Sequence, residues 1–320
     1  MDTPRHVTPG RLRRLREELL DEGVPVEGAT IAEALVDEID YAIRPPRHER
    51  RLPAYGSIVL PSVDINLWTE ATDLDVSLSP ATSRADDDAR RYADGRVSFA
   101  LRGVDGVEAV LVFDRSAGSE RDLVILAEAT GGFVVQRRGD GQVRVVGSFG
   151  VARWDSGEWH LEPPFGSWLQ RAACGLDDDA STCLDRLLRF AVHDLGASGI
   201  GSLLILGASD TADFEERMSA PPPLHVDRPS DLGPLRHVLS QVDGAALFRL
   251  DGTLEHLGVR LVPSPEAERS VDPLGGTRHT AARRFSADDP AAVVIAVSEG
   301  GPVTVFRQGR VIGRSDPAQT

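Results

Sequence analysis

The stretch GGTRHTAARRFSADDPAAVVIAV, residues 275–297, decides the fold of the C-terminal part of this chain. A pair of glycines precedes a short helical segment, which leads into the uncharged apolar run Val293–Val297. A second apolar run, Val303–Phe306, follows the turn Glu299-Gly300-Gly301, so the two runs predict a β-hairpin. Helices that alternate with buried strands indicate an α/β domain with a mixed sheet.

The same alternation extends upstream to about residue 180, so we assign residues 180–320 to one α/β domain. Ser181 is the expected N-cap of a helix with leucines at helical spacing, and Gly196 ends that helix. The segments that follow are a buried strand at Leu203–Leu206, a helix near Asp231–Ser240 and a strand at Ala245–Leu250.

The N-terminal half has a different pattern. Residues 1–51 predict two helices and a basic, proline-rich linker; Thr8-Pro9 begins the first helix, and Thr30 with Glu33 forms a capping-box pattern for the second. Residues 52–165 predict a strand-rich α+β domain, and the acidic run Asp86–Asp88 is the expected start of a solvated helix. The expected strands are Ser57–Leu60, Val63–Trp68, Leu74–Leu78, Arg96–Leu101, Val107–Phe113, Leu123–Ala127, Phe133–Arg137 and Gln142–Val146.

Charge and composition exclude several classes of protein. The formal net charge is −15, which argues against nucleic acid or an acidic membrane surface as the main partner. The sequence has no lysine, so it has no P-loop and no Schiff-base chemistry. Neither a secretory signal nor an apolar run of about 20 residues is present, and we expect a cytoplasmic protein that binds no membrane.

The helix that starts at Gly276 carries the clearest chemical signal. Glycines before a helix let the backbone approach a ligand, and the free N–H groups of the first turn bind phosphate. Thr277 can cap the helix or touch the phosphate, while Arg278 and His279 can donate hydrogen bonds to its oxygens. Taken alone, this pattern is also typical of an ordinary turn and N-cap before a helix.

Two acidic positions at strand ends complete the candidate site. Asp243 precedes an apolar strand, where a carboxylate can hold Mg²⁺ or Mn²⁺ and accept a proton from a hydroxyl. Ser298 and Glu299 follow the buried strand Val293–Val297. Each pattern also has a plain structural interpretation as a polar turn, because Asp-Gly occurs at other turns of this chain, such as Asp251-Gly252.

The order and spacing of these pieces carry more information than any one of them. Asp243-Gly244-Ala245, Gly258 to Leu261, Gly276 to His279, and Ser298-Glu299 follow one another as in the diadenylate cyclase domain, which residues 180–314 resemble. Gly201 to Leu206 is similar to the first core strand of that family.

The resemblance implies an enzyme that condenses two ATP into cyclic di-AMP and two pyrophosphates, with one ATP per protomer and two protomers face to face. It implies that Asp243, Arg278 and His279 are catalytic and that Asp243 and Glu299 hold Mg²⁺ or Mn²⁺. The nucleotide-binding positions it implies are Gly244, Ala245, Gly258, Leu261, Gly276, Thr277, Thr280 and Ser298.

Two departures from the family pattern leave an alternative open. The family commonly has arginine where this chain has Thr280, and Leu-His where it has Gln241-Val242. The alternative is a catalytically silent sensor that binds ATP or cyclic di-AMP.

Two segments of the N-terminal half resemble other sequences. The stretch Asp94 to Phe99 resembles sensor domains that precede such cyclases, so residues 52–165 are the expected regulatory domain. The segment Leu123–Val146 is also similar to the hairpin segment Val293–Val311, which indicates either a degenerate internal repeat or a chance similarity of hairpins.

Overall fold

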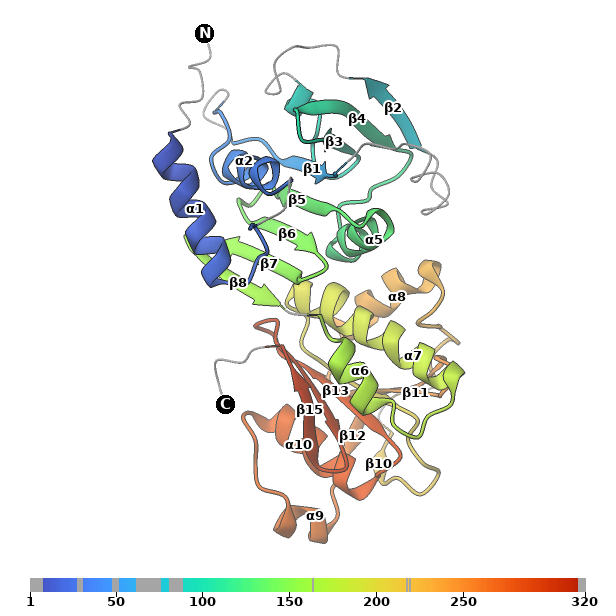
Figure 1. The fold of residues 1–320 in the computed structure, drawn as a ribbon. Helices are drawn as coiled ribbons and strands as arrows, with labels where there is room; N and C mark the ends of the chain where they lie inside the picture. Colours follow the sequence, from blue (N-terminus) through green and yellow to red (C-terminus); the bar gives the residue numbers. More distant parts are fainter. Residues whose placement is uncertain are drawn as a thin grey trace. The chain divides into compact units, whose positions relative to one another are not determined.

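Each half of the chain is built on one mixed sheet with helices packed against it (Figure 1). The C-terminal half is the α/β domain that the sequence predicts, and the N-terminal half is strand-rich, also as predicted. The computed structural model describes residues 8–27, 31–47, 52–61, 76–80, 89–162, 164–216, 218 and 220–315. The two units are Met1–Pro164 and Phe165–Thr320. No helix in the described part of the chain combines the length and the apolar character needed to cross a membrane.

The C-terminal unit contains a seven-stranded sheet with order β10-β12-β11-β9-β13-β14-β15. Only β9 and β11 pair in parallel; the other neighbouring strands are antiparallel. The strands are β9 (Ser202–Leu206), β10 (Phe214–Glu215), β11 (Ala245–Phe248), β12 (Leu254–Leu261), β13 (Val293–Val297), β14 (Val303–Arg307) and β15 (Arg310–Arg314).

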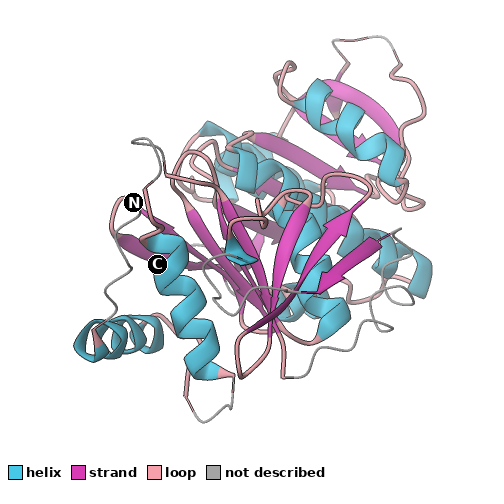
Figure 2. Cartoon of the chain, turned by 90° about the horizontal axis from the view of Figure 1, so that it is seen from above, coloured by secondary structure: helices cyan, strands magenta, loops and turns pink. Residues whose placement is uncertain are grey.

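Helices cover both faces of this sheet (Figure 2). The α-helices are α6 (Gly166–Ala172), α7 (Asp178–Arg189), α8 (Pro229–Leu239), α9 (Pro265–Ser270) and α10 (Thr277–Asp288), and two short helical segments, Phe190–Leu195 and Gly196–Ser198, follow α7. Side chains of α6, α7 and α8 pack on one face, where Leu204 and Ile295 are buried. Ala282 and Phe285 of α10 pack on the other face against Leu203 and Val294.

The N-terminal unit contains an eight-stranded sheet with order β2-β4-β3-β1-β5-β6-β7-β8. Its helices are α1 (Pro9–Asp21), α2 (Ala32–Ile43) and α5 (Glu120–Thr130). Its strands are β1 (Tyr55–Val59), β2 (Val76–Pro80), β3 (Ser98–Arg102), β4 (Val107–Phe113), β5 (Phe133–Arg137), β6 (Val143–Gly147), β7 (Gly150–Asp155) and β8 (Glu158–Glu162).

The helices α1 and α2 belong to the core of this unit. Leu15 and Leu19 of α1 and Leu35 and Ile39 of α2 pack with residues of β1, β5 and β6, such as Val135. The expected separate segment 1–51 is therefore part of the first unit, because its apolar helix faces are buried against the sheet. The second unit likewise begins before residue 180, at Phe165, because α6 contributes Trp168 to its core.

The expected strand Leu123–Ala127 is wrong, because these residues lie in α5. Ser119 and Asp122 form a capping box at the start of this helix, and Gly131 ends it in the left-handed conformation with φ of 61°. Leu123, Leu126 and Ala127 then lie on one buried face at helical spacing. The apolar run is short enough to fit either period, and the cap decides between them.

Other expectations differ at the ends of elements. The N-cap of α7 is Asp177, whose carboxylate accepts from the Ala180 N–H, so Ser181 lies inside the helix. The strands β7 and β8 lie where no strand was predicted. The expected cap at Thr30, the strand Val63–Trp68, Leu74 of the strand Leu74–Leu78, and Asp86–Asp88 lie outside the described residues.

Candidate nucleotide-binding site

Sheet topology brings distant segments of the C-terminal unit to one edge. The strand β11 runs parallel to β9, whereas β12 and β13 are antiparallel to their neighbours β11 and β9. The start of β11 and the ends of β12 and β13 therefore meet at the same edge of the sheet. Asp243, Leu261 and Ser298 are thus brought together although 55 residues of sequence separate the first from the last.

A cavity of about 1230 Å³ opens at this edge. Its lining includes all but one of the residues predicted to form the site: Asp243, Gly244, Ala245, Gly258, Leu261, Gly276, Thr277, Arg278, His279, Ser298 and Glu299. The exception is Thr280, whose hydroxyl is within hydrogen-bonding distance of the backbone N–H and carbonyl of Leu274, at 3.2 and 3.4 Å. Thr280 thus stabilises the loop before α10.

The first turn of α10 presents its backbone to the cavity. The N-cap Gly276 is extended, with φ −79° and ψ 177°, and no side chain caps the helix. Thr277, Arg278 and His279 form the first turn and all line the cavity. Uncapped N–H groups at the positive end of a helix dipole form a binding site for an anionic group such as phosphate.

Gly201 makes room for two charged side chains of the site. A Cβ atom at Gly201 would lie 2.5 Å from Nη1 of Arg278 and 2.7 Å from Cγ of Glu299. The same Nη1 donates to the Val297 carbonyl at 3.3 Å. The missing side chain at residue 201 therefore lets Arg278 reach across the end of β13.

His279 is half-buried beside other polar groups of the cavity. Its Nε2 lies 3.2 Å from Oγ1 of Thr304. Burial lowers the pKa of His279 below its ordinary value of 6.5, and the positive charges of Arg314 and Arg278 lower this pKa further. The imidazole is therefore mainly neutral at pH 7, so one ring nitrogen donates a hydrogen bond and the other accepts one, and the tautomer sets which nitrogen faces Thr304.

A close backbone approach explains two of the glycines. Gly244 has φ of +111°, and a Cβ atom there would lie 2.7 Å from the carbonyl carbon of Gly258. Gly258 has φ of +69° and is itself crowded by Met218 and Val242. The register of β11 on β12 shifts next to this contact. These two glycines let the backbone before β11 approach β12 closely at the cavity wall.

Asp243 and Glu299 are the acidic side chains that could hold a metal ion at this site. Both are exposed and line the same cavity. Among the described residues, no three His, Cys, Asp or Glu side chains are grouped as metal ligands. Two carboxylates suit Mg²⁺, which usually keeps several waters and is bound by one or two carboxylates together with substrate phosphates.

Several lining residues were not predicted from the sequence. They include Leu203 and Arg260, and also Thr304 of β14 and Val311 and Arg314 of β15. Thr304 and Arg314 are register partners, so β15 adds an arginine to the same side of the cavity. The sequence carries no local signal for Arg314, because its position depends on how β15 pairs with β14.

Comparison with known proteins assigns both halves of the chain. Residues 189–311 match the family described as "DisA bacterial checkpoint controller nucleotide-binding", abbreviated DAC. Residues 13–163 match the family described as "Probable sensor domain DACNK". No curated protein matches the chain.

Solved structures with partial similarity include two bacterial proteins. A "hypothetical membrane spanning protein" from Bacillus cereus is 20% identical over 41% of this chain and 66% of its own, with a TM-score of 0.33. A double-cysteine mutant of DacA from Staphylococcus aureus is 19% identical over 44% of this chain and 90% of its own, with a TM-score of 0.30. The chain thus matches a family of probable sensor domains in its first half and a nucleotide-binding family in its second half.

Proposed function

We propose that the C-terminal unit is a diadenylate cyclase, which condenses two ATP into cyclic di-AMP and two pyrophosphates. One observation carries this proposal: Asp243, the first turn of α10 and Glu299 line a single cavity of about 1230 Å³. The DAC family match supports the same conclusion. A cavity of this size holds a nucleotide, since ligand pockets commonly measure about 300–1,000 Å³.

ATP has a defined orientation in the proposed site. Its phosphates lie at the first turn of α10, where backbone N–H groups, Thr277 and Arg278 bind them. The nucleoside lies against Gly244 and Leu261, at the edge formed by β11 and β12. Asp243 lies at the start of β11 and faces the 3′-hydroxyl of the ATP that reacts.

The proposed reaction needs positioning and charge neutralisation more than covalent help. The 3′-oxygen of one ATP forms a bond to the α-phosphorus of the other, and the bond from that phosphorus to the bridging oxygen of pyrophosphate breaks. Asp243 accepts the hydroxyl proton, and Arg278 neutralises charge on the phosphates. Asp243 and Glu299 would hold Mg²⁺ or Mn²⁺, which supplies further neutralisation of phosphate charge when bound.

Arg314 replaces the positive charge that is lost because this chain has Thr280 where the family commonly has arginine. Arg314 lines the cavity from β15, and its charge acts on His279, which follows Arg278 in the first turn of α10. A guanidinium from a neighbouring strand can bind the same phosphate oxygens as one from the helix. We therefore assign Arg314 to phosphate binding.

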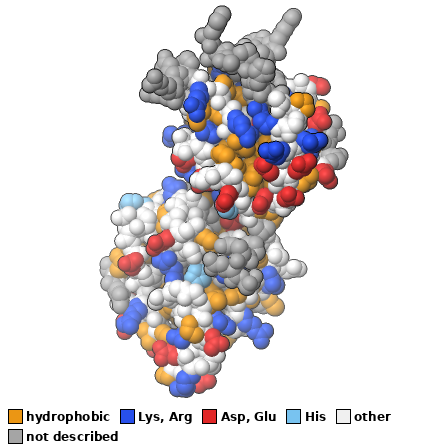
Figure 3. All heavy atoms as spheres, turned by 90° about the vertical axis from the view of Figure 1, so that its left-hand side faces the viewer, with side chains coloured by type: hydrophobic (Ala, Val, Ile, Leu, Met, Phe, Trp, Pro, Cys, Tyr) orange, Lys and Arg blue, Asp and Glu red, His pale blue; other side chains and the backbone are white. Residues whose placement is uncertain are grey.

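The two-fold symmetry of cyclic di-AMP requires two sites to meet. Each site holds one ATP, so the reactants are complete only when two protomers face each other about a two-fold axis. The chain carries a net charge of −15, and arginine and carboxylate side chains are interspersed on the face shown in Figure 3. Net repulsion opposes pairing, and the arginines of the site together with bound metal favour it.

The direct test is incubation of the purified chain with ATP and Mn²⁺ or Mg²⁺, followed by chromatography and a pyrophosphate assay. We expect cyclic di-AMP and pyrophosphate in a ratio of one to two. Tight ATP binding without turnover with either metal would instead support the alternative, a silent sensor of ATP or cyclic di-AMP.

A further inference from the structure

The two units of the chain share one strand topology. In chain order, the strands β1 to β7 correspond to β9 to β15, and the sheet orders β2-β4-β3-β1-β5-β6-β7 and β10-β12-β11-β9-β13-β14-β15 are then the same. In each sheet only the first and third strands of the series, β1 with β3 and β9 with β11, pair in parallel. The strand β8 is an addition at the edge of the first sheet.

The hairpins of the two units match residue by residue. Val134 pairs with Val146 as Val294 pairs with Phe306, and both hairpin loops have five residues. The Arg138 N–H donates to the Gln142 carbonyl, and the Ser298 N–H donates to the equivalent Pro302 carbonyl. Gly141 and Gly301 occupy the same place in the two loops with φ of 102° and 104°. This agreement extends the similarity seen between the two segments in the sequence.

The core faces match in the same register. Placing Val134 on Val294 places Ile58 on Ile205 and Leu101 on Leu247. The first member of each pair lies on the face covered by α5, and the second lies on the face covered by α10. The faces packed by α1 and α2 and by α6 and α7 correspond likewise.

We infer that the N-terminal unit is a second, diverged copy of the cyclase fold, in which the nucleotide site is closed by the protein's own carboxylate, Glu120. This inference rests on the nucleotide binding proposed for the C-terminal unit and not on its catalytic activity. The same register locates the lost site. Val97 precedes Leu101 by four residues, as Asp243 precedes Leu247, and Gly139 replaces Glu299 in the hairpin loop. The proposed metal carboxylates are therefore missing from the N-terminal copy.

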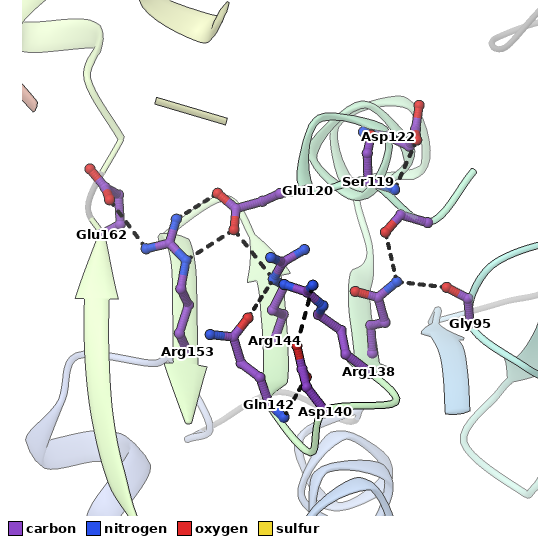
Figure 4. Close-up of polar contacts among 12 residues, drawn as sticks. Gly95, Ser119, Glu120, Asp122, Arg138, Asp140, Gln142, Arg144, Arg153 and Glu162 are labelled. Carbon is purple, nitrogen blue, oxygen red and sulfur yellow. Dashed lines mark hydrogen bonds and ion pairs between the residues drawn. The ribbon is translucent and has the colours of Figure 1, made fainter. Parts of the chain in front are cut away.

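The Glu120 carboxylate lies between Arg144 and Arg153 (Figure 4). Glu120 is the first residue of α5 and is only 2% exposed. Arg153 donates to its carboxylate from Nε at 2.9 Å and from Nη2 at 2.5 Å, and Arg144 lies 3.4 Å away. Arg144 and Arg153 hold the register positions of Thr304 and Arg314, the strand residues beside His279.

A buried carboxylate at a helix N-terminus between two arginines has the surroundings of a bound phosphate. The charge of Glu120 raises the pKa of Arg153 above its ordinary value, whereas burial lowers the pKa of Arg144 to about 10. Glu120 thus acts on both arginines, and Arg153 also donates to Glu162 at 3.2 Å. Glu120 supplies inside the chain the negative charge that ATP supplies in the C-terminal site.

Hydrogen bonds from the Gln136 side chain and from the backbone close the rest of the site. The Gln136 amide donates to the carbonyls of Gly95 and Gly118, at 2.6 and 2.9 Å, and so joins the segment before β3 to the loop before α5 (Figure 4). The Ala117 N–H also donates to the Arg96 carbonyl at 2.7 Å. A Cβ atom at Gly118 would lie 2.8 Å from the Gly95 carbonyl oxygen. The equivalent segments of the C-terminal unit border the open cavity.

The test removes the internal carboxylate from the full chain and supplies inorganic phosphate as the probe. We expect Glu120→Ala to lower the melting temperature of the N-terminal unit, because the buried Arg144 and the partly buried Arg153 lose the carboxylate that lies between them. Phosphate at about ten times its dissociation constant should restore roughly 3–6 °C, relative to sodium chloride of equal ionic strength. Hydrogen exchange followed by mass spectrometry should place the new phosphate-dependent protection in residues 133–155.

Asp122→Ala is the matched control, because it removes a partly buried carboxylate from the same helix turn, and this carboxylate bonds locally with Ser119. It should lower stability through the lost cap and leave the phosphate response at the wild-type level, which includes any binding in the C-terminal unit. The wild-type chain should bind one non-hydrolysable ATP analogue by calorimetry.

Three results would overturn the inference. The first is a phosphate response of Glu120→Ala equal to that of wild type, and the second is a wild-type stoichiometry of two ATP analogues per chain. If Glu120→Ala does not fold in chloride, the inference is tested by refolding this variant in phosphate at equal ionic strength. Recovery of the native circular dichroism supports the inference, and failure in both salts is the third overturning result.

Discussion

At the scale of single residues, the candidate site combines side chains that the fold does not need. Asp243 is exposed and Glu299 is exposed, whereas the neighbouring Ala245 and Val297 are buried in the sheet. Surface substitutions away from packed or capped positions usually change stability by less than about 0.5 kcal/mol. Variants of these acidic residues therefore report on chemistry with little interference from folding.

We expect Asp243→Asn to reduce cyclic di-AMP formation by about 100-fold or more, because a ligand of the proposed metal ion and a proton acceptor are lost together. The melting temperature should stay within about 2 °C of wild type. Turnover is measured at saturating ATP and Mn²⁺. Asp251→Asn is the matched control, since Asp251 lies in another Asp-Gly turn, contacts only the neighbouring Thr253 N–H and the exposed Arg249, and lies outside the cavity. Equal activity of the two variants would show that Asp243 is only a turn residue.

Gly201→Ala tests the placement of Arg278. The new methyl group would displace the guanidinium and the Glu299 side chain, which are flexible, so the stability cost should be small. We expect a loss of activity of about 10-fold to 100-fold, since a displacement of about 1 Å can cost that much in a positioned reaction. Gly166→Ala is the control, because a Cβ atom there meets nothing within 4 Å. Unchanged steady-state kinetics in Gly201→Ala would argue against a role for Arg278 as positioned here.

At the scale of elements, the site depends on the close approach of the backbones of β11 and β12, which are neighbours in the sheet. Gly244 and Gly258 both have positive φ, and the backbones approach within a distance that only glycine permits. The loop before α10 is held to this helix by the hydrogen bond from the Leu274 N–H to the Thr280 hydroxyl. The elements that border the cavity are thus set by backbone contacts as well as by side chains.

Gly244→Ala should destabilise the C-terminal unit by about 2 kcal/mol or more, because it combines a positive φ with a backbone clash. Gly166→Ala is again the control: Gly166 lies in the first turn of α6 with open space around it, so alanine should be neutral or stabilise by up to about 1 kcal/mol. Chemical denaturation of the full chain measures both. An unchanged free energy of unfolding in Gly244→Ala would mean that the two strands can move apart there without loss of stability.

At the scale of the whole molecule, assembly follows from the proposed reaction. Specific activity should rise with protein concentration in the dilute range and then level off, because two sites must meet. Moderate salt should shift this rise to lower concentration, since it screens the net charge of −15 on each chain. Activity assays run beside light scattering test this expectation. Constant activity per chain at concentrations where only monomer scatters would refute the shared site.

The sequence by itself determined the local features of this protein. The aliphatic runs at Leu203–Leu206 and Val293–Val297 became the buried strands β9 and β13, and the glycines before Thr277 became the start of α10. The order of Asp243, Gly276 and Glu299 was enough to predict one site. These features depend on nearest neighbours in the chain, which the sequence records directly.

Only the tertiary structure decided which strands pair and in what register. Pairing of β15 with β14 brought Arg314 into the cavity. The common topology of the two sheets, and the burial of Glu120 between Arg144 and Arg153, also follow from long-range pairing. Such contacts join residues far apart in the chain, and a shift of register by one residue would turn every side chain to the other face of the sheet.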